Sequence, residues 1–326
     1  MVDRKARADR IAVLIPCYNE AATIAKVVQD FHRVLPLADI HCFDNNSSDD
    51  TGRLAAEAGA IVTREKKQGK GHVVAAMFEK VDADYYLIVD GDDTYPAEHA
   101  GDLLAPLLAG KADMVVGRRE ADDSAAAYPR FHRLGNWLVG RLINLIFGAR
   151  LQDIMSGYRA LTREAAMNLP IMAYGFDIET EMTIQCLYRR WVVCEVPVAY
   201  RPRPEGSVSK LSTFRDGMKV IFRILSLFRS YKPLTFFGTM GILFFLMGGA
   251  LAAAVRFANW LPGSAYRLSL IIGAATLMAM SLIAVSIGVI VQLINFRFLE
   301  LDSVLRRGLP RSSKGHSRNG ASQDVD

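Results

Sequence analysis

Two long stretches without a charged residue constrain this chain more than any other feature of its sequence. The first runs for 22 residues from Leu234 to Val255, and the second runs for 29 residues from Leu268 to Phe296. A helix rises about 1.5 Å per residue, so each stretch is long enough to cross a hydrocarbon core of about 30 Å. The alternative is a pair of buried core helices, but a globular domain rarely needs core helices of this length. We therefore expect two transmembrane helices.

A short connection joins the two stretches and makes them a helical hairpin. It carries Trp260 and Tyr266, and such aromatic side chains favour the membrane–water interface. Lys and Arg residues are frequent on both outer sides of the hairpin, whereas the connection has only Arg256 and Arg267. This positive-inside bias predicts an integral protein of the inner membrane, or its equivalent, whose two termini and catalytic domain lie in the cytoplasm.

The remaining sequence divides by composition into further segments. Residues 1–10 form a polar tail without the apolar core of a secretory signal. We expect a catalytic domain over 11–212, an amphipathic juxtamembrane helix over 213–232, the two membrane helices within 233–297, and a polar, disordered cytoplasmic tail over 298–326. The four cysteines show neither metal-ligand nor redox spacing and are expected to be reduced thiols: Cys17, Cys42, Cys186 and Cys194.

Short apolar runs alternate with helical patterns in the first part of the catalytic domain. This alternation predicts an α/β fold, with a mostly parallel sheet and helices on both of its faces. After Arg119 the pattern becomes mixed, with helices expected near 134–147 and 177–189 and a strand at 191–200. The expected strands of the regular part are 11–16, 40–44, 60–63, 85–90 and 114–117, with helices expected at 20–34, 49–58, 71–81 and 97–108.

Polar residues follow the first, second and fourth of these strands, where open α/β sheets bind their ligands. The most informative group is Asp90-Gly91-Asp92-Asp93. Two carboxylates on either side of a glycine can face one hard cation, and their oxygens suit Mg²⁺ or Mn²⁺ bound to a diphosphate. The alternative is an acidic turn whose Asp residues cap the next helix.

Six motifs in a fixed order give this chain a family resemblance. They are Pro16/Tyr18/Asn19/Glu20, Asp44 with Thr51, Asp90-x-Asp92, Gly117-Arg118-Arg119, Asp153 with Ser156-Gly157-Tyr158-Arg159, and Arg203 with Gly206 and Ser209-Lys210-Leu211. The set resembles the family 2 glycosyltransferases with a GT-A fold. Within them it is most similar to the polyprenyl-phosphate group of dolichyl-phosphate mannose synthase and bactoprenol glucosyltransferase. The resemblance covers about Ile11 to Leu211, and a two-helix C-terminal anchor also occurs in that group.

The resemblance implies a donor site for a nucleotide-sugar. In the family, Thr94 is often replaced by Gln, so the third metal ligand stays open. Gly69-Lys70-Gly71 is interpreted as a loop-to-helix junction with a minor diphosphate contact, because it lacks the spacing of a phosphate loop. By the resemblance, Pro16, Tyr18, Glu20 and Asp44 hold the base and ribose, Asp90, Gly91 and Asp92 hold the diphosphate and its metal, and Arg203 and Lys210 belong to a loop over the diphosphate.

The resemblance also implies an acceptor site for a lipid phosphate. Arg119 and Arg133 match positions that meet this phosphate, and Arg130 is an alternative to Arg133. A phosphate monoester is already largely an oxyanion at neutral pH, so no strong general base is required. We expect Asp153 to orient the acceptor or the donor sugar, and the alternative is a structural carboxylate that caps the turn at Ser156-Gly157.

The expected activity is therefore an inverting transfer of a hexose from a nucleotide-diphosphate sugar to polyprenyl phosphate at the cytoplasmic membrane face. A UDP-sugar is favoured over GDP-mannose, and the sugar cannot be read from the sequence. The chain should contact the lipid bilayer but no nucleic acid, and its anchors could pack into a dimer or tetramer. One alternative is a processive polysaccharide synthase, but Leu187 replaces the Gln of the Gln-x-x-Arg-Trp element. Another is a catalytically silent nucleotide-sugar-binding membrane protein.

Overall fold

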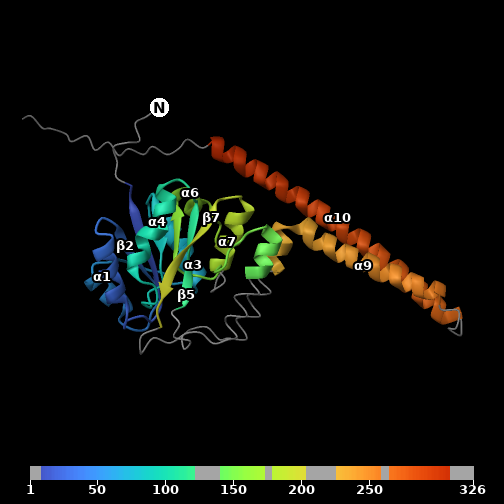
Figure 1. Ribbon diagram of the computed structural model, residues 1–326, viewed down its shortest axis with the longest axis horizontal. Coiled ribbons are helices and arrows are strands. Elements are labelled where there is room, and N and C mark those ends of the chain that lie inside the picture. The colour runs from blue at the N-terminus through green and yellow to red at the C-terminus, as the bar shows by residue number, and fades with distance from the viewer. Residues whose placement is uncertain (1–8, 122–139, 173–177, 203–224, 258–263, 309–326) are drawn as a thin grey trace, which may run out of the picture. The chain divides into compact units, whose positions relative to one another are not determined.

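The computed structural model describes residues 9–121, 140–172, 178–202, 225–257 and 264–308. The chain divides into two compact units, Met1–Phe228 and Arg229–Asp326. The first unit is a sheet with helices packed against it, and the second contains two long helices (Figure 1). Several expected elements lie wholly or partly outside the described residues, including most of the amphipathic helix over 213–232, of which residues 225–231 are seen as helical.

The first unit contains a seven-stranded sheet of order β3-β2-β1-β4-β6-β5-β7. The predicted mostly parallel sheet is confirmed, because only β6 runs antiparallel to its two neighbours β4 and β5. The strand β6 was not predicted. The strands are β1 (Ile11–Cys17), β2 (Asp39–Asp44), β3 (Ile61–Arg64), β4 (Tyr85–Ile88), β5 (Met114–Ala121), β6 (Arg159–Thr162) and β7 (Val193–Tyr200).

Helices cover both faces of this sheet and form two hydrophobic cores. Alternate residues of β1 enter different cores: Val13 and Ile15 pack with α1 and α4, whereas Ala12 and Leu14 pack with α3, α6 and α7. This alternation follows from the two-residue period of a strand that is buried on both faces. The helices are α1 (Ile24–Val34), α2 (Thr51–Glu57), α3 (Lys70–Lys80), α4 (Ala100–Leu108) after a 3-10 turn at Ala97–His99, α6 (Arg163–Asn168) and α7 (Ile178–Tyr188), with residues 140–147 also helical.

The sheet order places the carboxyl ends of three strands next to one another. The strand β1 pairs in parallel with β2 on one side and with β4 on the other, and Cys17 at its end lies opposite Asp44. The residues that follow β1, β2 and β4 therefore meet at one edge of the sheet. This is the edge at which the sequence predicts the donor site.

The second unit pairs α9 (Pro233–Phe257) with α10 (Ser264–Gly308). Glycines of α9 allow the two helices to approach each other closely. A Cβ at Gly241 would lie 2.8 Å from Val285 Cγ2, and one at Gly248 would lie 3.1 Å from the Ala274 oxygen. Both helices are long and apolar enough to span a membrane. The helix α10 continues beyond the predicted end at Phe296, so the start of the expected tail is helical as far as Gly308.

Candidate active site

The first wall of the candidate site is made by the loops that follow β1 and β2. These two loops are tied together, because Glu20 N donates to Thr51 Oγ1 at 2.8 Å and Ser48 N donates to Asn19 Oδ1 at 2.8 Å. Asp44 is buried at the end of β2 and accepts a hydrogen bond from Ser47 N at 2.9 Å. The predicted residues Pro16, Tyr18, Glu20 and Asp44 thus come from the ends of β1 and β2 and from the loop that follows β1.

Asn45 is a residue of this wall to which sequence reasoning gave no role. Its Nδ2 donates to the Lys67 oxygen at 2.7 Å, and its Oδ1 accepts from Gly69 N at 2.7 Å. Gly69 has a φ of +131°, which favours glycine, and it directly precedes α3. The buried Asn45 therefore fixes the loop that positions Lys70 at the start of α3.

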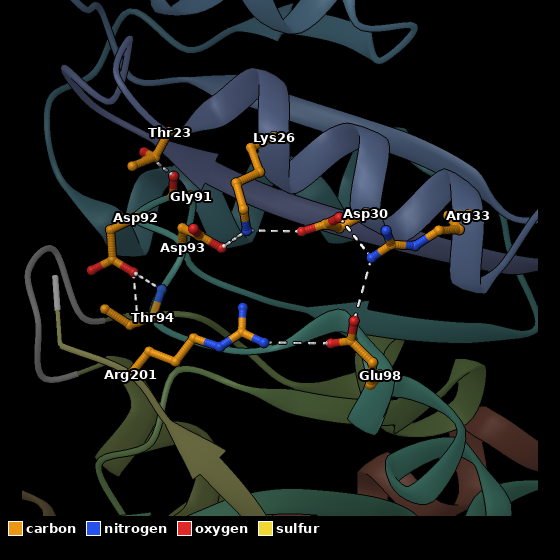
Figure 2. Close-up of polar contacts among 10 residues, drawn as sticks. All are labelled: Thr23, Lys26, Asp30, Arg33, Gly91, Asp92, Asp93, Thr94, Glu98 and Arg201. Atoms are coloured by element: carbon orange, nitrogen blue, oxygen red, sulfur yellow. Dashed lines mark hydrogen bonds and ion pairs between the residues drawn. The ribbon is translucent and has the colours of Figure 1, made fainter. Parts of the chain in front are cut away.

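The acidic turn after β4 forms the second wall. The Gly91 oxygen accepts a hydrogen bond from Thr23 Oγ1 at 2.7 Å, which ties the turn to the residue before α1 (Figure 2). Asp92 is buried, and its Oδ1 accepts from Thr94 Oγ1 at 2.6 Å. Asp93 has a φ of +58° and pairs with Lys26 at 2.7 Å. The Thr94 hydroxyl is therefore a donor that orients the Asp92 carboxylate.

A chain of ion pairs runs from this turn along α1. Lys26 bridges Asp93 and Asp30, and Arg33 bridges Asp30 and Glu98 (Figure 2). Arg201, just after β7, lies 3.9 Å from Glu98, and its backbone N donates to the Thr94 oxygen at 2.9 Å. The backbone that leads into the segment with Arg203 and Lys210 is therefore bound to the acidic turn.

Lys70 brings a positive charge to the acidic turn. Its Nζ lies 2.6 Å from Asp90 Oδ1 and 2.5 Å from Glu179 Oε1. Burial by itself would lower the pKa of Lys70, but the charges of Asp90 and Glu179 outweigh that effect and hold the pKa above its usual value. The sequence signal for Lys70 was the Gly69-Lys70-Gly71 junction. No local pattern identified Glu179, which lies in the first turn of α7.

The loop before β6 packs directly on the acidic turn. A Cβ at Gly157 would overlap the carboxylate of Asp90, so only glycine fits there without movement. Gly157 N also donates to Tyr95 Oη at 3.1 Å. Arg159 is fully buried, and its guanidinium donates to the oxygens of Ser156 and Ile154. Arg159 therefore fastens the loop that contacts Asp90.

Arg119 and Asp153 form a two-pronged ion pair at the end of β5. Arg119 Nε lies 2.6 Å from Asp153 Oδ2, and Arg119 Nη2 lies 2.7 Å from Asp153 Oδ1. The Arg119 guanidinium also lies over the ring of Tyr200, with 5.4 Å from its Cζ to the ring centroid. The backbone N of Asp153 donates to Glu195 Oε1 at 2.7 Å. The described contacts of the Asp153 carboxylate thus go to Arg119. Sequence reasoning missed Glu195 on β7, because its contact with the Asp153 backbone depends on the tertiary fold.

Several predicted site residues lie outside the described part of the chain. These are the acceptor arginines Arg130 and Arg133 and the loop residues Arg203 and Lys210. Among the described residues, the structure brings together the predicted donor-site residues at the ends of three strands. Near the end of β5 it pairs Arg119 with Asp153.

The donor set of the acidic turn fits a divalent cation that is shared with a ligand. Within the described residues, no group of three or more His, Cys, Asp or Glu side chains could hold a metal ion. Mg²⁺ is usually bound through one or two carboxylates together with water and substrate phosphates. Asp90 and Asp92 supply such oxygens, and Asp92 is held in place by Thr94. The residues present fit a metal bound with a diphosphate.

Comparisons with known proteins agree with this geometry. Residues 12–169 match the family described as glycosyl transferase family 2. Glycosyltransferase AglJ of Haloferax volcanii is 38% identical over 257 residues, which cover 78% of this chain and 84% of that protein. The dolichyl-phosphate hexose transferase of the same organism is 32% identical over 213 residues, which cover 65% of this chain and 91% of that protein.

A solved structure shows the same fold. It is glucosyl-3-phosphoglycerate synthase from Mycobacterium tuberculosis in complex with Mn²⁺, UDP-glucose and phosphoglyceric acid. The TM-score is 0.57 at 24% identity, and the match covers 68% of this chain and 80% of that chain. At this identity the likeness concerns the fold alone.

Proposed function

Because the chain belongs to glycosyl transferase family 2, it is a glycosyltransferase, and we propose that it moves a hexose from a nucleotide-diphosphate sugar to polyprenyl phosphate. The predicted family and the GT-A type of α/β fold are confirmed. Similarity to a dolichyl-phosphate hexose transferase supports the lipid acceptor. We keep a UDP-sugar as the favoured donor, on the resemblance of the sequence motifs, with GDP-mannose as the alternative.

The observation that carries the proposal is the acidic turn in a chain that also has two long apolar helices. Asp90 and Asp92 follow β4, the strand next to β1, and Asp44 ends β2 on the other side of β1. A polyprenyl acceptor is confined to a bilayer, so an enzyme that uses it must hold its site near the headgroups. The hairpin of α9 and α10 would supply that anchor, with the catalytic unit and both termini on the cytoplasmic side.

On the donor side, the acidic turn would bind the cation that neutralises the leaving diphosphate. A bound Mg²⁺ or Mn²⁺ supplies Lewis-acid neutralisation of the diphosphate as negative charge develops on it. Asp90 and Asp92 would hold this cation. The Thr94 hydroxyl fixes the Asp92 carboxylate, and Thr23 fixes the Gly91 backbone, so the turn needs little reorganisation.

On the acceptor side, positioning dominates over proton transfer. An oxygen of the lipid phosphate attacks the anomeric carbon, and the bond from that carbon to the diphosphate oxygen breaks. The attacking oxygen is already ionised near neutral pH, so no side chain has to remove a proton. Arg119 would bind this phosphate, and Asp153 would hold Arg119 in place. A single displacement inverts the anomeric configuration, so an α-linked donor gives a β-linked product.

The proposal is tested with membranes that contain the full chain, a radiolabelled UDP-sugar or GDP-mannose, Mn²⁺ and polyprenyl phosphate. We expect an organic-soluble, acid-labile product that depends on the acceptor and is lost when EDTA replaces Mn²⁺. A water-insoluble polymer would instead indicate a processive synthase. Nucleotide-sugar binding without any product would indicate a silent binding protein.

A further inference from the structure

A buried cation lies against the carboxylate that the proposed reaction requires for its metal. Lys70 Nζ is 2.6 Å from Asp90 Oδ1, and the Lys70 side chain is only 13% exposed. The same Nζ is 2.5 Å from Oε1 of Glu179, whose side chain is 7% exposed. The three groups come from the start of α3, the turn after β4 and the first turn of α7. They form one lysine between two carboxylates.

The charges of this cluster are held in place on several sides. Gly157 packs against the Asp90 carboxylate, and the Asn45 contacts fix the loop before Lys70. The Lys70 ammonium is therefore held at a fixed place between two carboxylates.

A lysine and a divalent metal cannot share Asp90 without cost. Both are cations, they compete for the same carboxylate oxygens, and they repel each other at short distance in a partly buried site. If Asp90 were the sole partner of Lys70, a metal on Asp90 would leave a buried ammonium unpaired, which is strongly unfavourable. Glu179 removes this difficulty, because it already contacts Lys70 and can keep it paired.

We propose that Lys70 is an internal counter-cation of Asp90 that the donor's divalent metal displaces, and that Glu179 is the positioning residue that keeps Lys70 paired after this exchange. The inference rests on the proposed function, since it assumes that Asp90 holds the metal of the donor. Its consequence is that the free enzyme binds the metal weakly. The metal then enters together with the nucleotide, whose phosphates supply the further negative charge.

The test is a double-mutant cycle on the Mn²⁺ affinity of the full chain in detergent, with UDP at saturation. Free Mn²⁺ is measured by electron paramagnetic resonance for the wild type, Glu179→Gln, Lys70→Met and the double variant. We expect Glu179→Gln to weaken Mn²⁺ binding about tenfold, because Lys70 then has no anionic partner besides Asp90. In the Lys70→Met background, Glu179→Gln should change the affinity by less than about twofold.

The outcomes separate the exchange from a general charge effect. If Glu179→Gln weakens Mn²⁺ binding equally in both backgrounds, Glu179 acts only through its charge, and the inference is overturned. Lys70→Met could fail to fold because Glu179 is left unpaired. In that case the double variant tests the inference, since it contains neither the Lys70 nor the Glu179 charge. It must bind Mn²⁺ at least as tightly as the wild type, and an affinity as weak as that of Glu179→Gln overturns the inference.

Melting temperatures with and without Mn²⁺ and UDP confirm that each variant is folded. The test also distinguishes this inference from the proposed function. If the wild type with UDP does not bind Mn²⁺, the metal-assisted reaction fails and the inference fails with it. If the wild type binds Mn²⁺ and Glu179→Gln binds it equally well, only the exchange of Lys70 is wrong.

Discussion

The Lys70–Asp90 pair and the Arg119–Asp153 pair of the catalytic unit differ in which partner carries the proposed role. In the first pair, the carboxylate of Asp90 carries the proposed role and Lys70 is its partner. In the second pair, the guanidinium of Arg119 carries the proposed role and Asp153 is its partner. In both places the working group already has a counter-ion from the protein, at 2.6 Å.

The two pairs also differ in what holds the counter-ion in place. The lysine at the donor edge has a second carboxylate, Glu179, and so can leave Asp90 without becoming unpaired. Asp153 is instead fixed through its backbone by Glu195 and binds Arg119 with both carboxylate oxygens. We therefore expect the metal to displace Lys70 from Asp90, and Arg119 to stay paired with Asp153 when it binds phosphate.

The largest effect should follow the loss of charge at the buried carboxylate of the donor edge. We expect Asp92→Asn to lower kcat/KM about 10³-fold, because the leaving diphosphate loses its metal ligand. The Asn side chain can still accept the Thr94 hydrogen bond, so the turn should stay folded. The measurement is the rate of lipid-linked product formation at saturating Mn²⁺.

Asp93→Asn is the matched control for this variant. Asp93 belongs to the same turn but pairs with the exposed Lys26. Its replacement should change the rate by less than about tenfold, because Asp93 is not a proposed metal ligand and its partner Lys26 is 53% exposed. Equal losses in both variants would show that the turn is sensitive to any change of charge, and the specific role of Asp92 would be abandoned.

The next largest effect should come from adding one methyl group beside Asp90. Gly157→Ala would place a Cβ on the Asp90 carboxylate and displace it from its present position beside Lys70. We expect activity to fall about a hundredfold, since a displacement of about 1 Å is enough for such a loss. The control is Gly101→Ala in α4, where a Cβ meets nothing within 4 Å and should stabilise the fold by about 0.5–1 kcal/mol. An active Gly157→Ala enzyme would contradict the tight packing of this loop.

The parts of the fold that were predicted correctly are those that local patterns encode. The apolar run of β1 and the acidic turn after β4 were both read from neighbouring residues. The strand β6 was missed because it is short and begins with Arg159, a charged residue that is buried only through the tertiary contacts of its guanidinium. The pairing of Lys70 with Glu179 was missed for a similar reason, since helices far apart in the sequence supply the two residues.

A smaller effect should follow a change in the Arg119–Asp153 pair. Asp153→Asn keeps one oxygen for Arg119 but removes the charge, so we expect about a tenfold fall in kcat/KM through a higher KM for polyprenyl phosphate. The pH–rate profile should keep its shape, because Asp153 holds Arg119 and removes no proton. Complete loss of activity, together with loss of a log-linear limb that the wild type shows at low pH, would instead make Asp153 a general base.

The smallest effect should come from the ion pairs of Glu98, which are exposed to solvent, unlike the Lys70–Asp90 and Arg119–Asp153 pairs. Glu98 lies 3.3 Å from Arg33 and 3.9 Å from Arg201, and its side chain is 56% exposed. We expect Glu98→Gln to change the free energy of unfolding by less than about 0.5 kcal/mol and the activity by less than about twofold, because water and salt screen these pairs. The backbone bond from Arg201 to Thr94 stays intact in this variant and still fixes the turn. Denaturant unfolding at low and high salt measures the change in the free energy of unfolding. A loss of activity close to that of Asp153→Asn would mean that the ion pairs of Glu98 position the acidic turn as strongly as the buried pairs do.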